Sequence, residues 1–279
     1  MSAATWGAAD FAGGLVTRRL GAFVTVAVSQ TAGLAGAALF VVLTGEPLPP
    51  PQAIVWALAA GIVGLVGISA LYRLLADGRM SIGSPLVAVI GAGLPVIVAL
   101  LFGERLPASD AAGIALGLAA VVLVSIPSRS APSNDGRLDA RLLLLAVLAG
   151  SGIALFYLFV DRAATEGAGA WWILTGARAT TVLLVLVGLL VARPALPAAG
   201  AGLRSLLATA IAVGLGDLLG NAFFLASNAE GPLSVAVVLS SLYPVTTIIL
   251  ARIFLHERLR GGQLIGVVAA LAGVVLIAI

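Results

Sequence analysis

The sequence predicts an all-α integral membrane protein whose ten transmembrane helices form a 5+5 inverted-topology repeat. Three observations carry this prediction: an apolar composition, a series of long apolar segments, and an internal duplication. Hydrophobic residues make up 61% of the 279 residues and charged residues only 10%, whereas soluble domains carry about 25% charged residues. The lipid bilayer is therefore expected to solvate most of the chain.

The duplication relates residues 57–126 to residues 210–279 at a constant offset of 257 − 104 = 153, without a gap. Of the 70 aligned positions 19 are identical. Apolar matches say little, because membrane helices resemble each other by composition, so the glycine and charged matches carry the argument. Glu104-Arg105-Leu106 recurs as Glu257-Arg258-Leu259, and the other pairs are Gly61 with Gly214, Gly67 with Gly220, Gly78 with Gly231, Ser81 with Ser234 and Gly113 with Gly266. Such duplications are typical of secondary transporters.

Ten apolar segments approach or exceed the roughly 20 residues that a helix needs to cross a bilayer. Pro, Gly and charged residues separate them. The predicted spans are residues 2–16, 22–44, 53–76, 81–102, 109–127, 139–160, 169–192, 203–227, 232–255 and 261–279. No basic residue precedes the first span, so it is not a signal peptide. Its shortness is compatible with a true start further upstream.

A polar stretch, residues 128–141, joins the two halves. The predicted organisation is a first five-helix repeat over 1–127, a linker over 128–138 and a second repeat over 139–279. An odd number of spans per half inverts the second repeat relative to the first. Every basic residue is Arg: 12 fall in loops on one side, 2 on the other, and Arg178 lies inside a span. The positive-inside rule places the Arg-rich loops in the cytoplasm and both termini outside.

Three ionisable residues lie near the middle of spans: Asp10, Arg178 and Asp217. Each would cost at least about 2.5 kcal/mol at a lipid-facing helix centre, so they should face the interior. One interpretation is a purely structural ion pair of Arg178 with Asp217 or with Asp10. The other is a substrate path, with Arg178 as anion contact or counter-ion. At least one Asp then lacks this partner, and Asp10 is the predicted proton or cation site.

Uncharged polar and aromatic residues extend the predicted substrate site. Asn221 shares a helix face with Asp217, four residues before it, although polar pairing between helices would also explain it. The segment that holds Ser240 and Tyr243 is rich in hydroxyl groups, and Pro244 is expected to kink its helix, as is Pro95 in the fourth span. Two aromatic residues are predicted either to line the cavity or to pack in the core: Trp6 and Tyr157.

The composition also excludes several classes of site. The chain has no Cys and a single His, His256, so neither a metal site nor a cofactor is predicted. No G-x-x-x-x-G-K-[ST] motif is present, so any energy coupling should come from an ion gradient. No basic cluster interleaves with aromatic residues, so nucleic acid is not an expected partner. The fifth and tenth spans carry almost no polar residues but small residues four apart, which predicts a scaffold or a homodimer face.

Several motifs point to one family. They are Trp6-Gly7 with Asp10-Phe11-x-Gly13-Gly14, then Gly103-Glu104-Arg105-Leu106, and Leu242-Tyr243-Pro244 running to His256-Glu257-Arg258-Leu259 with Gln263 and Gly266. On these residues nearly the whole chain resembles the EamA-type ten-helix transporters of the drug/metabolite transporter superfamily. The resemblance implies a central cavity lined by helices 1–4 and 6–9, and transport of amino acids, other metabolites or drugs. It also implies that both termini are cytoplasmic, whereas the arginine count places them outside. We keep the prediction from the arginine count.

The sequence therefore predicts a non-enzymatic secondary transporter in the cytoplasmic membrane. It would move a small polar, amino-acid-like metabolite by alternating access, with export as the expected direction. The expected partners are the substrate, the bilayer and a second copy of the chain. Two alternatives remain open: a non-transporting membrane assembly subunit, and a membrane-embedded enzyme, for which the sequence offers no nucleophile or metal cluster.

Overall fold

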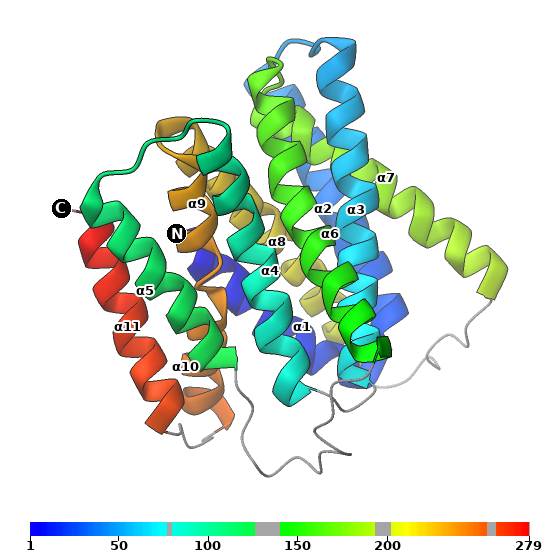
Figure 1. Cartoon of the computed structure of the whole chain (residues 1–279). Helices are drawn as coiled ribbons and strands as arrows, with labels where there is room; N and C mark the ends of the chain where they lie inside the picture. Colours follow the sequence, from blue (N-terminus) through cyan, green and yellow to red (C-terminus); the bar gives the residue numbers. More distant parts are fainter. Residues whose placement is uncertain (77–79, 126–139, 193–201, 256–260, 279) are drawn as a thin grey trace. The chain divides into compact units, whose positions relative to one another are not determined.

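A computed structural model describes residues 1–76, 80–125, 140–192, 202–255 and 261–278. The predicted linker, His256 and the second Glu-Arg-Leu triplet lie outside these ranges. Every regular element in the described ranges is an α-helix (Figure 1). The helices are α1 (Ser2–Leu20), α2 (Ala22–Thr44), α3 (Pro51–Ala76), α4 (Met80–Leu101), α5 (Ala108–Ser125), α6 (Ala140–Thr165), α7 (Ala170–Ala192), α8 (Leu203–Glu230), α9 (Leu233–Ser240), α10 (Tyr243–Leu255) and α11 (Gly261–Ala278).

Within the described residues each of the ten predicted spans coincides with a helix, but the ninth is divided into α9 and α10 at Ser241 and Leu242. Pro244 explains the position of this break. Proline has no backbone N–H to donate to the preceding turn, and its fixed backbone angle favours the first turn of a new helix. Pro95, by contrast, lies inside an unbroken α4 and is fully buried. The kink predicted at Pro244 is thus a helix break, whereas α4 continues past Pro95.

Seven helices of the described ranges are long and apolar enough to cross a membrane, counting Leu233–Phe254 as one, and two shorter apolar helices accompany them. The first helix, α1, is in neither group. It carries Asp10 and continues past the predicted end at residue 16, so that Arg18 and Arg19 form its last turn. Positive charge is favourable there because it opposes the negative end of the helix dipole. The structure is that of a multi-pass membrane protein.

Exposed positions on the helices are strongly apolar, the reverse of a water-soluble surface. Leu190 and Val191 at the end of α7 are 75% and 80% exposed, and Phe102 after α4 is 90% exposed. Alanine and glycine occupy many of the buried contacts instead, including Ala57, Ala60 and Ala210. This distribution is expected where lipid tails solvate the outer face and close backbone packing holds the helices together.

Two compact units make up the chain, and each contains helices from both sequence halves. The first comprises residues 1–62 and 159–226 and holds α1, α2, α7 and most of α8. Within it α2 packs against α7. A Cβ on Gly214 of α8 would lie 2.0 Å from the backbone oxygen of Ser29 in α2, and one on Gly61 of α3 would lie 2.2 Å from that of Ala177 in α7. Glycine is required at both crossings.

The second unit comprises residues 63–158 and 227–279. Its closest helix pair is α5 with α11, which run side by side in Figure 1. A Cβ on Gly113 would lie 2.8 Å from the backbone oxygen of Gly273, and one on Gly266 would lie 2.8 Å from Val124. The small residues of these two helices thus contact each other within one chain. A homodimer through α5 and α11 remains a prediction and would have to use other faces of these helices.

Replacing Gly214 should test the close crossing of α8 and α2. We expect Gly214→Ala to lower the free energy of unfolding by about 2 kcal/mol, because overpacking of a fixed backbone contact costs about 1–3 kcal/mol. Gly216→Ala is the matched control on the same helix, since its Cβ would lie at an ordinary 3.4 Å from Ala9. Thermal unfolding in detergent measures both, and equal midpoints would contradict the crossing.

Candidate functional site

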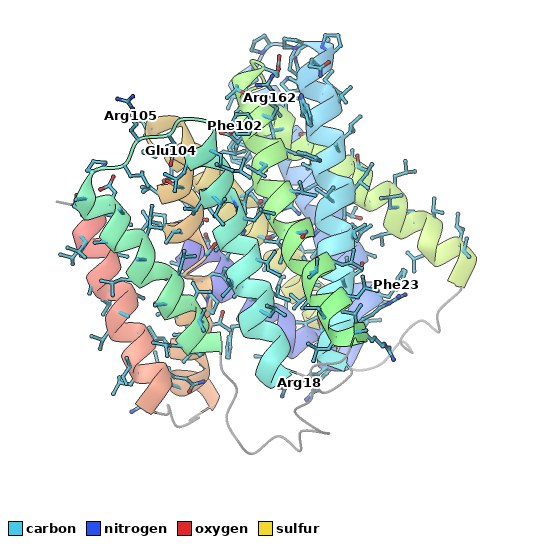
Figure 2. All side chains as sticks on the ribbon, in the orientation of Figure 1. Arg18, Phe23, Phe102, Glu104, Arg105 and Arg162 are labelled. Atoms are coloured by element: carbon cyan, nitrogen blue, oxygen red, sulfur yellow. The ribbon has the colours of Figure 1, made fainter. Side chains whose placement is uncertain are left out.

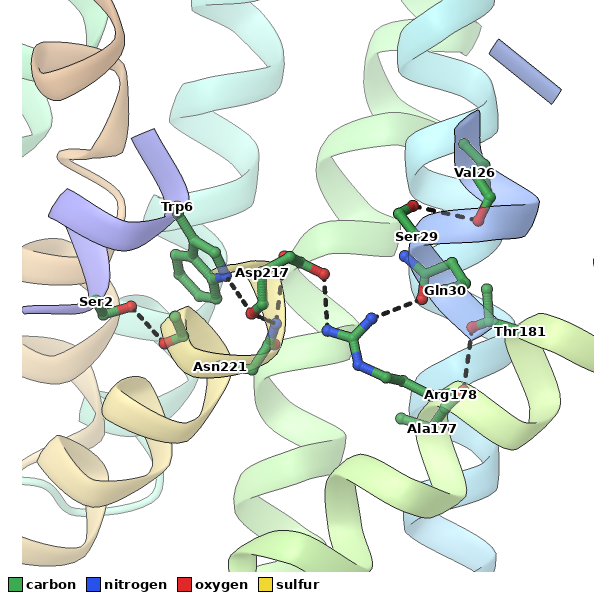
Figure 3. Close-up of polar contacts among 11 residues, drawn as sticks. Ser2, Trp6, Val26, Ser29, Gln30, Ala177, Arg178, Thr181, Asp217 and Asn221 are labelled. Atoms are coloured by element: carbon green, nitrogen blue, oxygen red, sulfur yellow. Dashed lines mark hydrogen bonds and ion pairs between the residues drawn. The ribbon is translucent and has the colours of Figure 1, made fainter. Parts of the chain in front are cut away.

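Arg178 is the centre of a polar cluster inside the first unit (Figure 3). It extends from α7, and only 5% of the residue is exposed. Its Nη1 donates to Oε1 of Gln30 in α2 at 2.8 Å, and its Nη2 donates to Oδ2 of Asp217 in α8 at 2.7 Å. The guanidinium therefore links three helices, and the contact with Asp217 is an ion pair.

A glycine in α2 makes room for the Arg178 side chain. A Cβ on Gly33 would lie 2.8 Å from Nη1 and 2.9 Å from both Cδ and Cζ of Arg178. Gln30 and Gly33 are three residues apart, so they lie on the same face of α2. That face supplies both a hydrogen-bond acceptor and a flat backbone surface for the guanidinium. The Nε atom of Arg178 is buried and finds no hydrogen-bond partner in the described part of the chain.

The face of α8 that meets Arg178 carries Asp217 and Asn221. Asn221 is 5% exposed. Its Nδ2 donates to the backbone oxygen of Asp217 at 2.7 Å and approaches Oδ1 of the same residue at 3.4 Å. The side chain of Asp217 is 35% exposed, against 6% for that of Arg178. The more accessible member of this ion pair is therefore the carboxylate.

Trp6 brings α1 against the same turn of α8. Its Nε1 donates to the backbone oxygen of Asp217 at 3.2 Å, and its ring stacks on Phe224 with centroids 6.3 Å apart. A Cβ on Gly220 would lie 2.3 Å from the indole, so glycine is needed at this contact. One turn nearer the N-terminus of α1, the hydroxyl of Ser2 donates to the backbone oxygen of Gly220 at 2.8 Å.

Asp10 follows Trp6 by four residues and so occupies the same side of α1. It is exposed and takes no part in the hydrogen bonds that hold Arg178. Because Trp6 contacts the turn of α8 that carries Asp217, this side of α1 brings Asp10 toward the same region. The cluster thus contains two carboxyl groups and one guanidinium, and of the two possible partners Arg178 pairs with Asp217.

The other predicted site residues lie in the second unit. Tyr157 is 4% exposed in α6, and its ring meets Phe156 edge-on. Ser240 is the buried last residue of α9, and Tyr243 begins α10, where its backbone oxygen accepts a hydrogen bond from Thr247. Their predicted role in substrate binding stays a prediction.

Gln30 was not among the site residues predicted from the sequence. A signal was present, because Ser29, Gln30 and Thr31 interrupt the middle of an otherwise apolar span. A polar amide at that depth requires a partner, and Arg178 is the strongest one available.

No group of three or more His, Cys, Asp or Glu residues within the described ranges is arranged to hold a metal ion.

The apolar helices, together with a buried arginine that polar groups neutralise, are those of a multi-pass membrane protein. The model of the EamA-like transporter family matches residues 1–126 and 140–279, so the chain belongs to that family. No curated protein matches it by sequence. One solved structure, titled only "Crystal structure of protein", aligns over 100% of this chain and 98% of its own with a TM-score of 0.70 and 20% identity. That similarity supports the fold alone.

The ion pair of Arg178 and Asp217 can be tested through stability. We expect Asp217→Asn to lower the free energy of unfolding by about 2 kcal/mol. Leaving a buried charge unpaired costs about 3–5 kcal/mol, and the partial exposure of Asp217 reduces the loss. Arg178→Met with Asp217→Asn should cost less than the sum of the single changes. Thermal unfolding of the four proteins measures this coupling, and additive losses would argue against the pair.

Proposed function

We propose that the chain is a secondary transporter that carries a small polar, amino-acid-like metabolite across the cytoplasmic membrane, with export as its direction. The observation that supports this most strongly is the ion pair of buried Arg178 with Asp217 in a member of a transporter family, together with a second carboxylate, that of Asp10, outside the pair. Ionisable groups inside membrane helices mark substrate or ion paths by default. An ion pair with no transport role would not need Asp10.

The exposures of the charged groups suggest a role for each. Arg178 is buried and already bonded to Gln30 and Asp217, so we assign it the role of counter-ion rather than anion contact. Asp217 is one-third exposed, and we propose that it contacts a positively charged or hydrogen-bonding group of the substrate. Trp6 and Asn221 would fix the position of its turn. Asp10 would take up the coupling proton or cation.

Alternating access would follow from the duplicated sequence. We propose that the two halves contain five spans each and have inverted topology. Their movement about a midplane site would convert the protein between inward-open and outward-open states. Basic residues occupy the last turns of α1, α3 and α10 on the proposed cytoplasmic side, and Arg162 occupies that of α6 on the opposite side. The excess on the first side supports cytoplasmic Arg-rich loops and external termini under the positive-inside rule.

Transport and its dependence on Asp217 can be tested in one comparison. Cells that overproduce the unmodified protein should shift a small set of metabolites from the cell to the medium. Asp217→Asn should reduce that shift at least about tenfold, as loss of one charge-assisted contact would. Asp110→Asn, an equivalent change in the first turn of α5, is the control and should transport normally. An unchanged shift with Asp217→Asn would remove Asp217 from the mechanism.

Ion coupling can then be assigned in proteoliposomes with the substrate so found. Asp10→Asn should still exchange substrate across the membrane but should lose accumulation driven by an imposed proton gradient, because an amide cannot bind the proton. The gradient is applied at equal protein density for the two proteins. Accumulation that survives this substitution would rule out Asp10 as the proton site.

A further inference from the structure

The five-residue pattern Gly-Glu-x-Leu-Pro occurs twice, at residues 45–49 and 103–107. The first copy follows α2 and the second lies just after the end of α4. Gly45 has φ 64° and Gly103 has φ 96°, conformations that end a helix and that glycine adopts without strain. The two copies thus place a glutamate directly after a left-handed turn at the end of a helix.

Glu46, in the first copy, binds the N-terminus of α7. Its Oε1 accepts from the backbone N–H of Trp171 at 3.3 Å, and its Oε2 accepts from that of Trp172 at 3.1 Å. The indole Nε1 of Trp172 donates to the backbone oxygen of Glu46 at 3.1 Å. Trp171 also stacks on Phe40 of α2, with centroids 4.3 Å apart and planes inclined by 13°. Several independent contacts therefore hold this end of α7.

Glu104, in the second copy, binds the N-terminus of α9 through one residue. The hydroxyl of Ser234 donates to Oε1, and its backbone N–H lies 3.5 Å from Oε2, at the outer limit of a hydrogen bond. Glu104 lies near α9 in Figure 2, whereas Arg105 points outward and is exposed. No indole contact or ring stack accompanies Glu104 among the contacts of the described residues.

The helix that Glu104 holds is itself short. It has eight residues and is separated from α10 by Ser241 and Leu242. Its buried residues include Val237, at 0% exposed, and Ser240, at 2%. A short segment with a break at one end and a polar contact through a single residue at the other can shift without unfolding a long helix. By contrast, α7 has 23 residues and is unbroken.

We propose that the two glutamates have different roles: Glu46 fixes the start of α7 permanently, whereas Glu104 is a latch that releases α9 during the transport cycle. The cycle itself rests on the proposed function. The latch can be examined without substrate, since it predicts that loss of the Glu104 contact lets water reach the buried side of α9.

The cysteine-free sequence makes this measurable with one reporter. Ser240→Cys places a thiol at the buried end of α9, and its alkylation by a water-soluble maleimide is followed in membranes. Glu104→Gln should raise the alkylation rate on the order of tenfold, because a neutral amide is a weaker acceptor than a carboxylate. Ser234→Ala removes the other side of the contact and should have the same effect. Glu46→Gln is the matched control and should leave the rate unchanged.

A disulfide tests whether release is part of transport. Glu104→Cys with Ser234→Cys should cross-link on oxidation, stop transport of the substrate identified above, and recover on reduction. Undiminished transport by the cross-linked protein would overturn the latch, as would an unchanged alkylation rate with Glu104→Gln or an equal rise with Glu46→Gln. Failure of the proposed function looks different: the unmodified protein would move no metabolite, while the alkylation rates would still decide the latch.

Discussion

The need to keep the Arg178 guanidinium neutralised inside an apolar helix bundle determines the structure of the first unit. An arginine at such a depth is tolerated only with a counter-charge and hydrogen-bond acceptors. Asp217 supplies the charge from α8, and Gln30 supplies an acceptor from α2. The backbones must then lie close together, which accounts for glycine at position 33 under the guanidinium and at position 214 where α8 crosses α2.

Lipid changes what can hold such a bundle together. Between helices already solvated by hydrocarbon, burying leucine gains little, so association relies on close backbone contact and on polar bonds. Both units use the first means, as at Gly113 beside Gly273 in the second unit. The first unit also uses the second means, because hydrogen bonds from Arg178 join its helices. Trp6 adds a further hydrogen bond to the turn that carries Asp217. The large apolar side chains are left to face outward.

Local patterns in the sequence predicted the positions of the helices and of the charged residues. They did not predict which residues pair when those residues lie far apart in the sequence. The helical segments follow from apolar runs bounded by Pro, Gly and charge, and the three candidate charged residues follow from their position inside those runs. The sequence could not decide whether Arg178 pairs with Asp217 or Asp10, because both are acids at similar depth on different helices. Glu46 was missed for the same reason, since its partners lie more than a hundred residues away.

The unequal exposure of the charged groups has a consequence for what the site can bind. Arg178 is shielded, while Asp217 is partly accessible and Asp10 is exposed. A solute near this cluster would meet carboxylates before it met the guanidinium. With both acids ionised, the cluster of two carboxylates and one guanidinium carries one negative charge in excess. Under the proposed function, a proton or the ammonium group of the substrate would neutralise that excess charge, and competition between the two at neighbouring carboxylates would couple substrate movement to the proton gradient.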